Sequence, residues 1–183
     1  MITKLITLPE KILRRKQLKN LNKNPKVSLL GNIRLGYPIS FVIYPEMHSL
    51  EIGKDFNIRN YVHFIIGNNA DLKIGYNVFM NNFCSVNCLE YIKIGDNTLF
   101  GENVKIYDHN HKYERTDAGL TVSHSEFTTA QVIIGKNCWL GSNVTVLKGV
   151  TIGDNCIIGA GCTIAKDVPA NSTIINQQQL VFK

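Results

Sequence analysis

The C-terminal half of the chain places an aliphatic residue at every sixth position. A period of six matches neither the 3.6-residue turn of an α-helix nor the alternation of a simple strand. It fits a coil of three short strands per turn, one on each side of a triangular prism, with one aliphatic side chain per side pointing inward. Glycine follows four of these positions and suits the tight corners. The repeated residues are Ile134, Leu140, Val146, Ile152, Ile158 and Ile164.

The same pattern extends toward the N-terminus with looser spacing. An Ile-Gly step recurs at 52–53, 66–67, 74–75 and 94–95. The segment 107–131 lacks the aliphatic period, is polar and holds three of the five histidines. A loop of this length in a compact fold is usually functional or disordered. We therefore predict an all-β coil over 27–175 with one long extruded loop at about 107–131.

The cysteines fit the inward positions of the coil. Cys138, Cys156 and Cys162 each come four residues after a repeated aliphatic residue, and Cys84 follows Met80 by the same interval. A free cysteine serves there as a small apolar side chain. The Cys84–Cys88 spacing is a weak hint of zinc, and we favour core packing over a metal site or a disulfide framework.

A basic segment precedes the coil. The first 26 residues contain eight Lys/Arg against one Glu, whereas the remaining 157 contain 12 Lys/Arg against 13 Asp/Glu. No motif for reading bases accompanies this charge, so we expect no nucleic-acid partner. A helical pattern over 8–20 predicts a short N-terminal helix. Two roles stay open: a cap on one end of the coil, or an interfacial helix drawn to anionic lipid.

Other features of the chain limit where it works. Its apolar runs are too short to cross a bilayer, and no secretory signal is evident. We expect a cytoplasmic protein, at the inner face of the membrane if the N-terminal helix binds lipid. The predicted organisation is a basic helical segment at 1–26, the coil at 27–175 and a tail at 176–183.

Two long stretches of the sequence resemble the hexapeptide-repeat acetyltransferases. These stretches are IGDNTLFGENVKIYDHNH and VIIGKNCWLGSNVTVLKGVTIGDNCIIGAGCTIAKDVPANS. The nearest members are the galactoside and maltose O-acetyltransferases and the O-acetyltransferases of surface polysaccharides. The resemblance implies a left-handed parallel β-helix and a homotrimer with active sites between subunits. It also implies transfer of acetyl from acetyl-CoA to a sugar or polysaccharide hydroxyl, without a metal.

Acetyl transfer to a hydroxyl needs a base for the proton and donors for the oxyanion. In an alignment without gaps, the catalytic histidine of the family falls on His111, and His109 takes the role if the register shifts by two. A His-x-His pair can also bind zinc, but no third ligand follows at a recognisable spacing. The three-histidine zinc spacing of γ-class carbonic anhydrases, which share this coil, is absent as well.

The resemblance also implies binding residues for both substrates. Asn81, and less directly Asn82, match the asparagine that contacts the acceptor sugar. Leu89 stands where the family places an acceptor-binding carboxylate, so Glu90 or Glu102 would be the substitute. The pantetheine arm of acetyl-CoA is expected to contact Trp139, Gly141, Ser142, Ala160 and Gly161. Lys166 is expected to meet the CoA phosphates.

Two other functions fit the same coil. One is acetyl transfer to the amino group of a nucleotide sugar. The other is a scaffold without catalysis, because fold alone does not define activity. The DHNH element, the long loop and the Trp139–Ser142 pair favour an enzyme.

Overall fold

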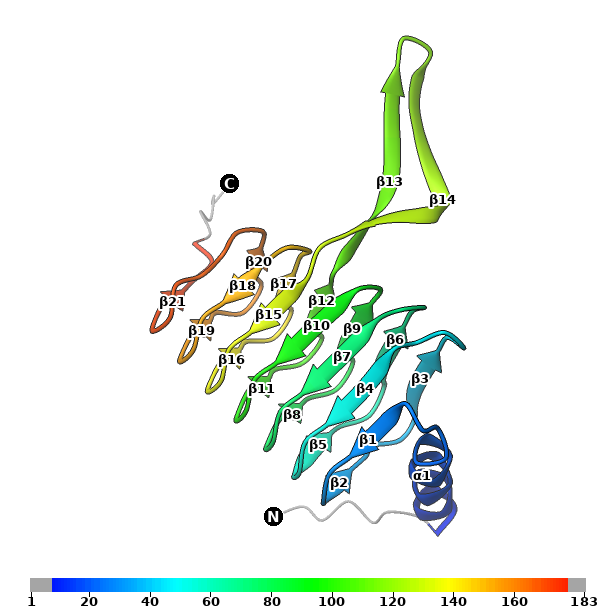
Figure 1. Ribbon diagram of the computed structural model, residues 1–183. Helices are drawn as coiled ribbons and strands as arrows, with labels where there is room; N and C mark the ends of the chain where they lie inside the picture. The colour runs from blue at the N-terminus through cyan, green and yellow to red at the C-terminus, as the bar shows by residue number, and fades with distance from the viewer. Residues whose placement is uncertain (1–7, 178–183) are drawn as a thin grey trace, which may run out of the picture.

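In the computed structural model, the chain winds into a coil with three parallel sheets along its sides (Figure 1). The structure describes residues 8–177; the predictions for 1–7 and 178–183, including most of the tail, lie outside the described residues. Followed from β1 onward, the coil turns with a left hand, which confirms the predicted fold (Figure 1).

Each turn of the coil contributes one strand to each sheet. Sheet A contains β1 (Val27–Leu29), β4 (Ser49–Ile52), β7 (Asp71–Ile74), β10 (Tyr91–Ile94), β15 (Val132–Ile134) and β18 (Thr151–Ile152). Sheet B contains β2 (Ile33–Arg34), β5 (Phe56–Ile58), β8 (Phe79–Met80), β11 (Leu99–Phe100), β16 (Trp139–Leu140), β19 (Ile157–Ile158) and β21 (Thr173–Ile174). Sheet C contains β3 (Ile39–Ile43), β6 (Val62–Ile66), β9 (Ser85–Cys88), β12 (Lys105–Tyr107), β17 (Thr145–Val146) and β20 (Thr163–Ile164).

The turns of the coil shorten along the chain. Leu50 pairs with Leu72, 22 residues later, whereas Ile134 pairs with Ile152, 18 residues later. The extra residues of the early turns lie between sheets C and A, as in the step from β6 to β7. This explains why the six-residue period is strict only in the C-terminal half.

The core is a single column of inward-pointing side chains. All five cysteines are free and buried within it, so the packing interpretation is confirmed. Burial raises the pKa of the Cys84 thiol to about 11, which keeps it protonated near neutral pH. A protonated thiol is a poor nucleophile.

Asparagine and glycine form the corner between sheets A and B. Five asparagines there have positive φ, between 53° and 63°, and their amides bond from one turn to the next at 2.9–3.1 Å. At Gly95, a Cβ would lie 2.5 Å from the carbonyl carbon of Gly135, so the backbones approach too closely for any side chain. The asparagine ladder comprises Asn77, Asn97, Asn137, Asn155 and Asn171.

The helix α1 (Leu8–Leu21) lies at the N-terminal end of the coil (Figure 1). Leu18 packs against the core, and Leu21 is buried. The Gln17 side chain donates to the Ile39 carbonyl on the edge strand β3 at 3.0 Å. The cap interpretation therefore agrees with the contacts. Among residues 8–177, no helix has the length and apolar character needed to cross a membrane.

The segment predicted as a loop is an antiparallel hairpin that projects from the coil (Figure 1). Its strands are β13 (His109–Thr116) and β14 (Gly119–Thr129). Both faces of the hairpin are largely exposed, so the segment carries no apolar alternation that would predict strands. Sheet A continues past the hairpin, because Ile94 pairs with Ile134.

Candidate functional site

A buried carboxylate and a histidine meet where β12 leaves the coil. The Asp108 side chain is fully buried and accepts hydrogen bonds from the backbone N–H groups of Leu89, Glu90 and Tyr91 at 2.7–3.0 Å. His109 Nδ1 lies 3.0 Å from Asp108 Oδ1, and the His109 ring is 17% exposed.

The hydrogen bonds keep Asp108 ionised. Burial alone would raise the pKa of Asp108, but the bonds from His109 and from the Leu89 and Glu90 amides outweigh it and hold the pKa below its ordinary value. An ionised carboxylate at Nδ1 places the proton on that nitrogen. With the proton on Nδ1, the Nε2 atom of neutral His109 is free to accept a proton.

His111 lies further out on the hairpin. Its Nδ1 lies 2.9 Å from the Ser123 carbonyl oxygen, and its ring is exposed. Both histidine rings contact Phe127, with centroids 5.2 Å away for His109 and 4.7 Å for His111. The two candidates therefore share one wall, but only His109 is paired with a buried carboxylate. The geometry favours His109 over His111, the reverse of the order expected from alignment.

Sequence reasoning missed two residues of this site. Asp108 lies two positions after the buried Ile106, so its side chain points to the same, inner side of the strand. An acidic residue at an inward-facing position is the signal that could have identified it. Asn87 is 7% exposed and lies on β9 beside this site, where its backbone carbonyl accepts from the Asp108 amide at 3.5 Å and its side chain donates to Ser85 Oγ at 2.9 Å. No pattern in the sequence separates Asn87 from the many corner asparagines.

The predicted acceptor residues lie at two different corners. Glu90 is exposed at the corner between sheets C and A, and its backbone amide is bound to Asp108 beside His109. Asn81 and Asn82 follow β8 at the corner between sheets B and C. The Asn82 side chain donates to Glu102 at 3.1 Å. Within a single chain, Asn81 and Asn82 therefore lie at a different corner of the coil from His109.

Most predicted donor residues form a column on sheet B and its corner with sheet C. Trp139 on β16 is 53% exposed, and Gly141 packs against the backbone of Ala160, where a Cβ would lie 2.7 Å from the Ala160 nitrogen. Ser142 Oγ accepts from the Glu102 amide at 3.2 Å, which leaves its own O–H free to donate. Gly161 bonds the Ser142 carbonyl at 2.9 Å. Lys166 follows β20 and is exposed at the corner between sheets C and A, apart from this column.

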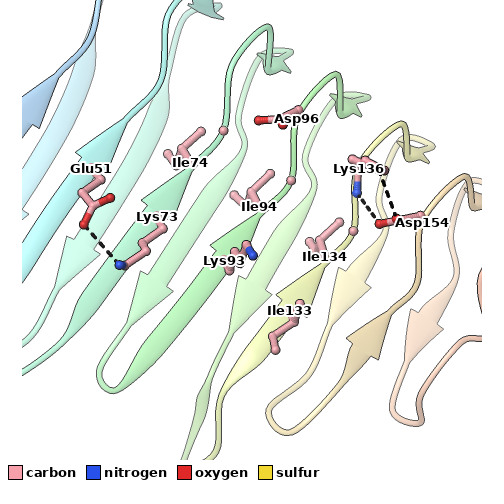
Figure 2. Close-up of a pocket in the computed structure, with 13 residues that line it drawn as sticks. Glu51, Lys73, Ile74, Lys93, Ile94, Asp96, Ile133, Ile134, Lys136 and Asp154 are labelled. Carbon is pink, nitrogen blue, oxygen red and sulfur yellow. Dashed lines mark hydrogen bonds and ion pairs between the residues drawn. The ribbon is translucent and has the colours of Figure 1, made fainter.

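A groove of about 480 Å³ also crosses the outer face of sheet A (Figure 2). Its lining includes the ion pair of Lys73 with Glu51 at 3.2 Å and that of Lys136 with Asp154 at 3.9 Å. None of the predicted catalytic or binding residues lines it. Within the described residues, no group of three His, Cys, Asp or Glu is arranged to hold a metal ion.

The C-terminal turns of the coil are built from a six-residue repeat. Residues 131–166 match the family model described as bacterial transferase hexapeptide (six repeats), and the resemblance seen in the sequence is confirmed.

Individual relatives are acetyltransferases or nodulation proteins. The chain is 40% identical to nodulation protein L of Rhizobium meliloti (strain 1021), over 68% of this chain and 65% of that protein. It is 31% identical to the putative lipopolysaccharide biosynthesis O-acetyl transferase WbbJ of Escherichia coli (strain K12), over 58% of this chain and 57% of that protein. The chain spans 42–65% of the length of the curated relatives it matches.

The fold also matches solved structures. The N-acyltransferase AntD from Bacillus cereus, in complex with dTDP and coenzyme A, superposes with a TM-score of 0.68 at 16% identity, over 84% of this chain and 81% of AntD. At this identity the match supports the fold.

Proposed function

We propose that this chain is an acetyl-CoA-dependent O-acetyltransferase acting on a sugar or polysaccharide hydroxyl. The observation that carries the proposal is the buried Asp108 that orients His109 beside the hairpin. The similarity to a putative O-acetyl transferase of lipopolysaccharide biosynthesis supports the activity. The coenzyme A complex of AntD, which shares the fold, supports the co-substrate.

His109 is the general base of the proposed reaction. Its Nε2 takes the acceptor hydroxyl proton as the oxygen attacks the thioester carbonyl carbon, and Asp108 stabilises the imidazolium that forms. The free O–H of Ser142 donates to the oxyanion of the tetrahedral intermediate. The carbon–sulfur bond then breaks, and His109 returns its proton to the CoA thiolate. The cysteines are buried in the core and supply no nucleophile, so transfer is direct.

The placement of the site residues supports a homotrimer. His109 and Glu90 lie at one corner of the coil, whereas Trp139, Ser142 and Asn81 lie on sheet B or its corner with sheet C. A complete site therefore requires the corner between sheets C and A of one subunit to meet sheet B of a neighbouring subunit. Cyclic oligomers repeat such a contact at every interface.

Replacing each histidine tests the proposed base. We expect His109→Ala to lower kcat by about 10²–10⁴ with the fold intact, because the hydroxyl then loses its general base. His111→Ala is the matched control on the same hairpin and is expected to keep most of the rate. CoA release from acetyl-CoA, with a panel of sugars as acceptors, is the readout.

Other outcomes of this assay select other functions. Full loss in His111→Ala with an active His109→Ala would restore the order expected from alignment. Turnover with amino nucleotide sugars alone would favour N-acetyl transfer. Absence of CoA binding would favour the scaffold.

We also propose that the outer face of α1 contacts anionic membrane. Ile12 and Leu13 are exposed beside the basic residues Lys11, Arg15 and Lys16. Basic and apolar side chains together favour the lipid interface. Co-sedimentation with phosphatidylglycerol vesicles is expected to fall in the triple variant Lys11→Gln, Arg15→Gln, Lys16→Gln. Equal sedimentation of variant and wild type would contradict membrane contact.

A further inference from the structure

A second cavity opens beside Asn81 and Asn82, at the N-terminal end of the coil. Its volume is about 600 Å³, and α1 and the first three turns of the coil all contribute to its wall. Three of the five arginines of the chain line it: Arg14 from α1, Arg34 from β2 and Arg59 after β5. The side chains of Asn57 and Asn60 complete the polar wall.

In this cavity, which we call the arginine cavity, the three arginines have no acidic partners among residues 8–177. No Asp or Glu lines the cavity, and none of the three arginines forms an ion pair with a described residue. Arg59 is held instead over the Phe79 ring, 5.7 Å from its centroid. Three uncompensated guanidinium groups around one hollow create a positive potential that attracts anions.

One arginine also presents an unsatisfied donor. Arg14 Nε is buried and has no hydrogen-bond partner in the described structure. Leaving a buried donor unpaired is costly, more so on a charged group. An anionic ligand in the cavity would supply the missing acceptor, and the planar guanidinium suits phosphate and carboxylate oxygens.

The asparagines that border the cavity are held in place. Asn60 Oδ1 accepts from the Tyr37 amide at 3.0 Å, and Asn82 Oδ1 accepts from the Asn60 amide at 3.1 Å. This chain of bonds fixes the rim without using the arginines. The asparagine rim therefore keeps its position whether or not a ligand is bound.

An aromatic pair lies on the same corner, next in sequence to these asparagines. Tyr61 and Phe83 stack with centroids 5.1 Å apart and are each more than half exposed. Both have positive φ, 60° and 64°. The equivalent corner positions of the next two turns are occupied by asparagines, Asn103 and Asn143. Bulky residues rarely adopt this conformation, and such exceptions concentrate at functional sites.

The cavity is within reach of the donor column. Asn81 bonds Phe100 in the next turn, and the Glu102 amide bonds Ser142 in the turn after that. Parallel strands lie about 4.8 Å apart, so the Asn81 and Ser142 levels are separated by roughly 10 Å. Arg59 lies one turn before Asn81, so its level is roughly 14 Å from that of Ser142. A sugar with one charged substituent, met by an extended arginine side chain, spans this distance.

We propose that the arginine cavity binds an anionic group, phosphate or carboxylate, carried by the acceptor, while Tyr61 and Phe83 pack against its sugar ring. The acceptor is then an acidic or phosphorylated glycan, not a neutral one. This inference rests on the proposed acetyl transfer for the role of the ligand, but the anion site itself is testable alone.

Calorimetric titration of the full chain with diphosphate, glucuronate and glucose tests the cavity. We expect at least one anion to bind and glucose not to bind. Arg14→Gln and Arg59→Gln should each weaken anion binding at least about tenfold, the loss of one charge-assisted contact. Arg15→Gln, which removes the same charge from the neighbouring position outside the cavity, should change it less than about twofold. Thermal unfolding of each variant identifies any that lose the fold. If one of Arg14→Gln and Arg59→Gln is unfolded, anion binding by the other tests the cavity.

The outcomes separate the sources of the anion and the two proposals. Tighter diphosphate binding assigns a phosphorylated acceptor, and tighter glucuronate binding assigns a carboxylate. Binding of neither anion, equal weakening by Arg15→Gln, or displacement of the anion by CoA would overturn the inference. If anions bind through Arg14 and Arg59 but acetyl-CoA binds nowhere, the site stands and the acetyltransferase proposal fails.

Discussion

At the scale of single residues, Asp108 determines how His109 is presented. Its carboxylate is bound by backbone amides of the preceding turn as well as by the imidazole, so the coil itself fixes the orientation of the ring. Alignment favoured His111 over His109, because both lie on a polar stretch without a repeat that could fix the register. The distinction depends on which of them faces the buried acid.

Replacing Asp108 with Asn should cost both stability and rate. An amide presents an NH₂ group to backbone donors, and we expect a loss of about 1–3 kcal/mol in unfolding free energy at pH 7. Because the native pKa of Asp108 is lowered, its contribution is present above the ordinary pKa and disappears as pH falls through the native value. Urea unfolding at pH 7, 4 and 2.5 should show the gap in unfolding free energy between wild type and variant narrowing only at pH 2.5, below the ordinary carboxyl pKa. A gap that is constant or widens toward acid would refute this role.

At the scale of elements, the repeated turn explains most of what the sequence could predict. The inward aliphatic residues and cysteines identified the coil, because burial imposes a period that ordinary helices and strands lack. The hairpin was missed as a pair of strands, because neither of its faces is buried. The arginine cavity was missed as well, because Arg14, Arg34 and Arg59 are far apart in sequence and meet only when α1 docks on the first turns.

The asparagine ladder gives a prediction at this scale. Asn137 combines positive φ with side-chain bonds to Asn97 and Asn155. Asn137→Ala should lose both bonds and strain the corner, at a cost of about 2–4 kcal/mol. Asn137→Gly should lose less, because glycine adopts positive φ freely. Chemical denaturation of the two variants measures the difference; equal losses would show that the backbone conformation contributes nothing.

At the scale of the whole molecule, the candidate site is divided between two parts of the coil. His109 lies between sheets C and A, and Trp139 lies on sheet B. The family resemblance implied a site between subunits, but residue spacing alone could not assign His109 and Trp139 to different faces, because that depends on how the turns place residues around the axis. A shared site has a specific consequence in mixed oligomers.

Mixing two inactive variants should restore activity if the site is shared. His109→Ala and Trp139→Ala subunits, refolded together in equal amounts, should form intact sites at about a quarter of the interfaces of a cyclic oligomer. Each variant refolded alone is the control, and sedimentation gives the number of subunits. No recovery in a mixed trimer would place the complete site within one chain.

The helix α1 has a further consequence for the open end of the coil. A parallel coil ends in rows of unpaired backbone groups, and such edges can recruit another chain. Gln17 occupies one of these acceptors on β3, and Leu18 covers part of the exposed core. The helix that supplies Arg14 to the cavity therefore also covers an edge strand of the coil, so a change that undocks α1 would open the cavity and expose that edge together.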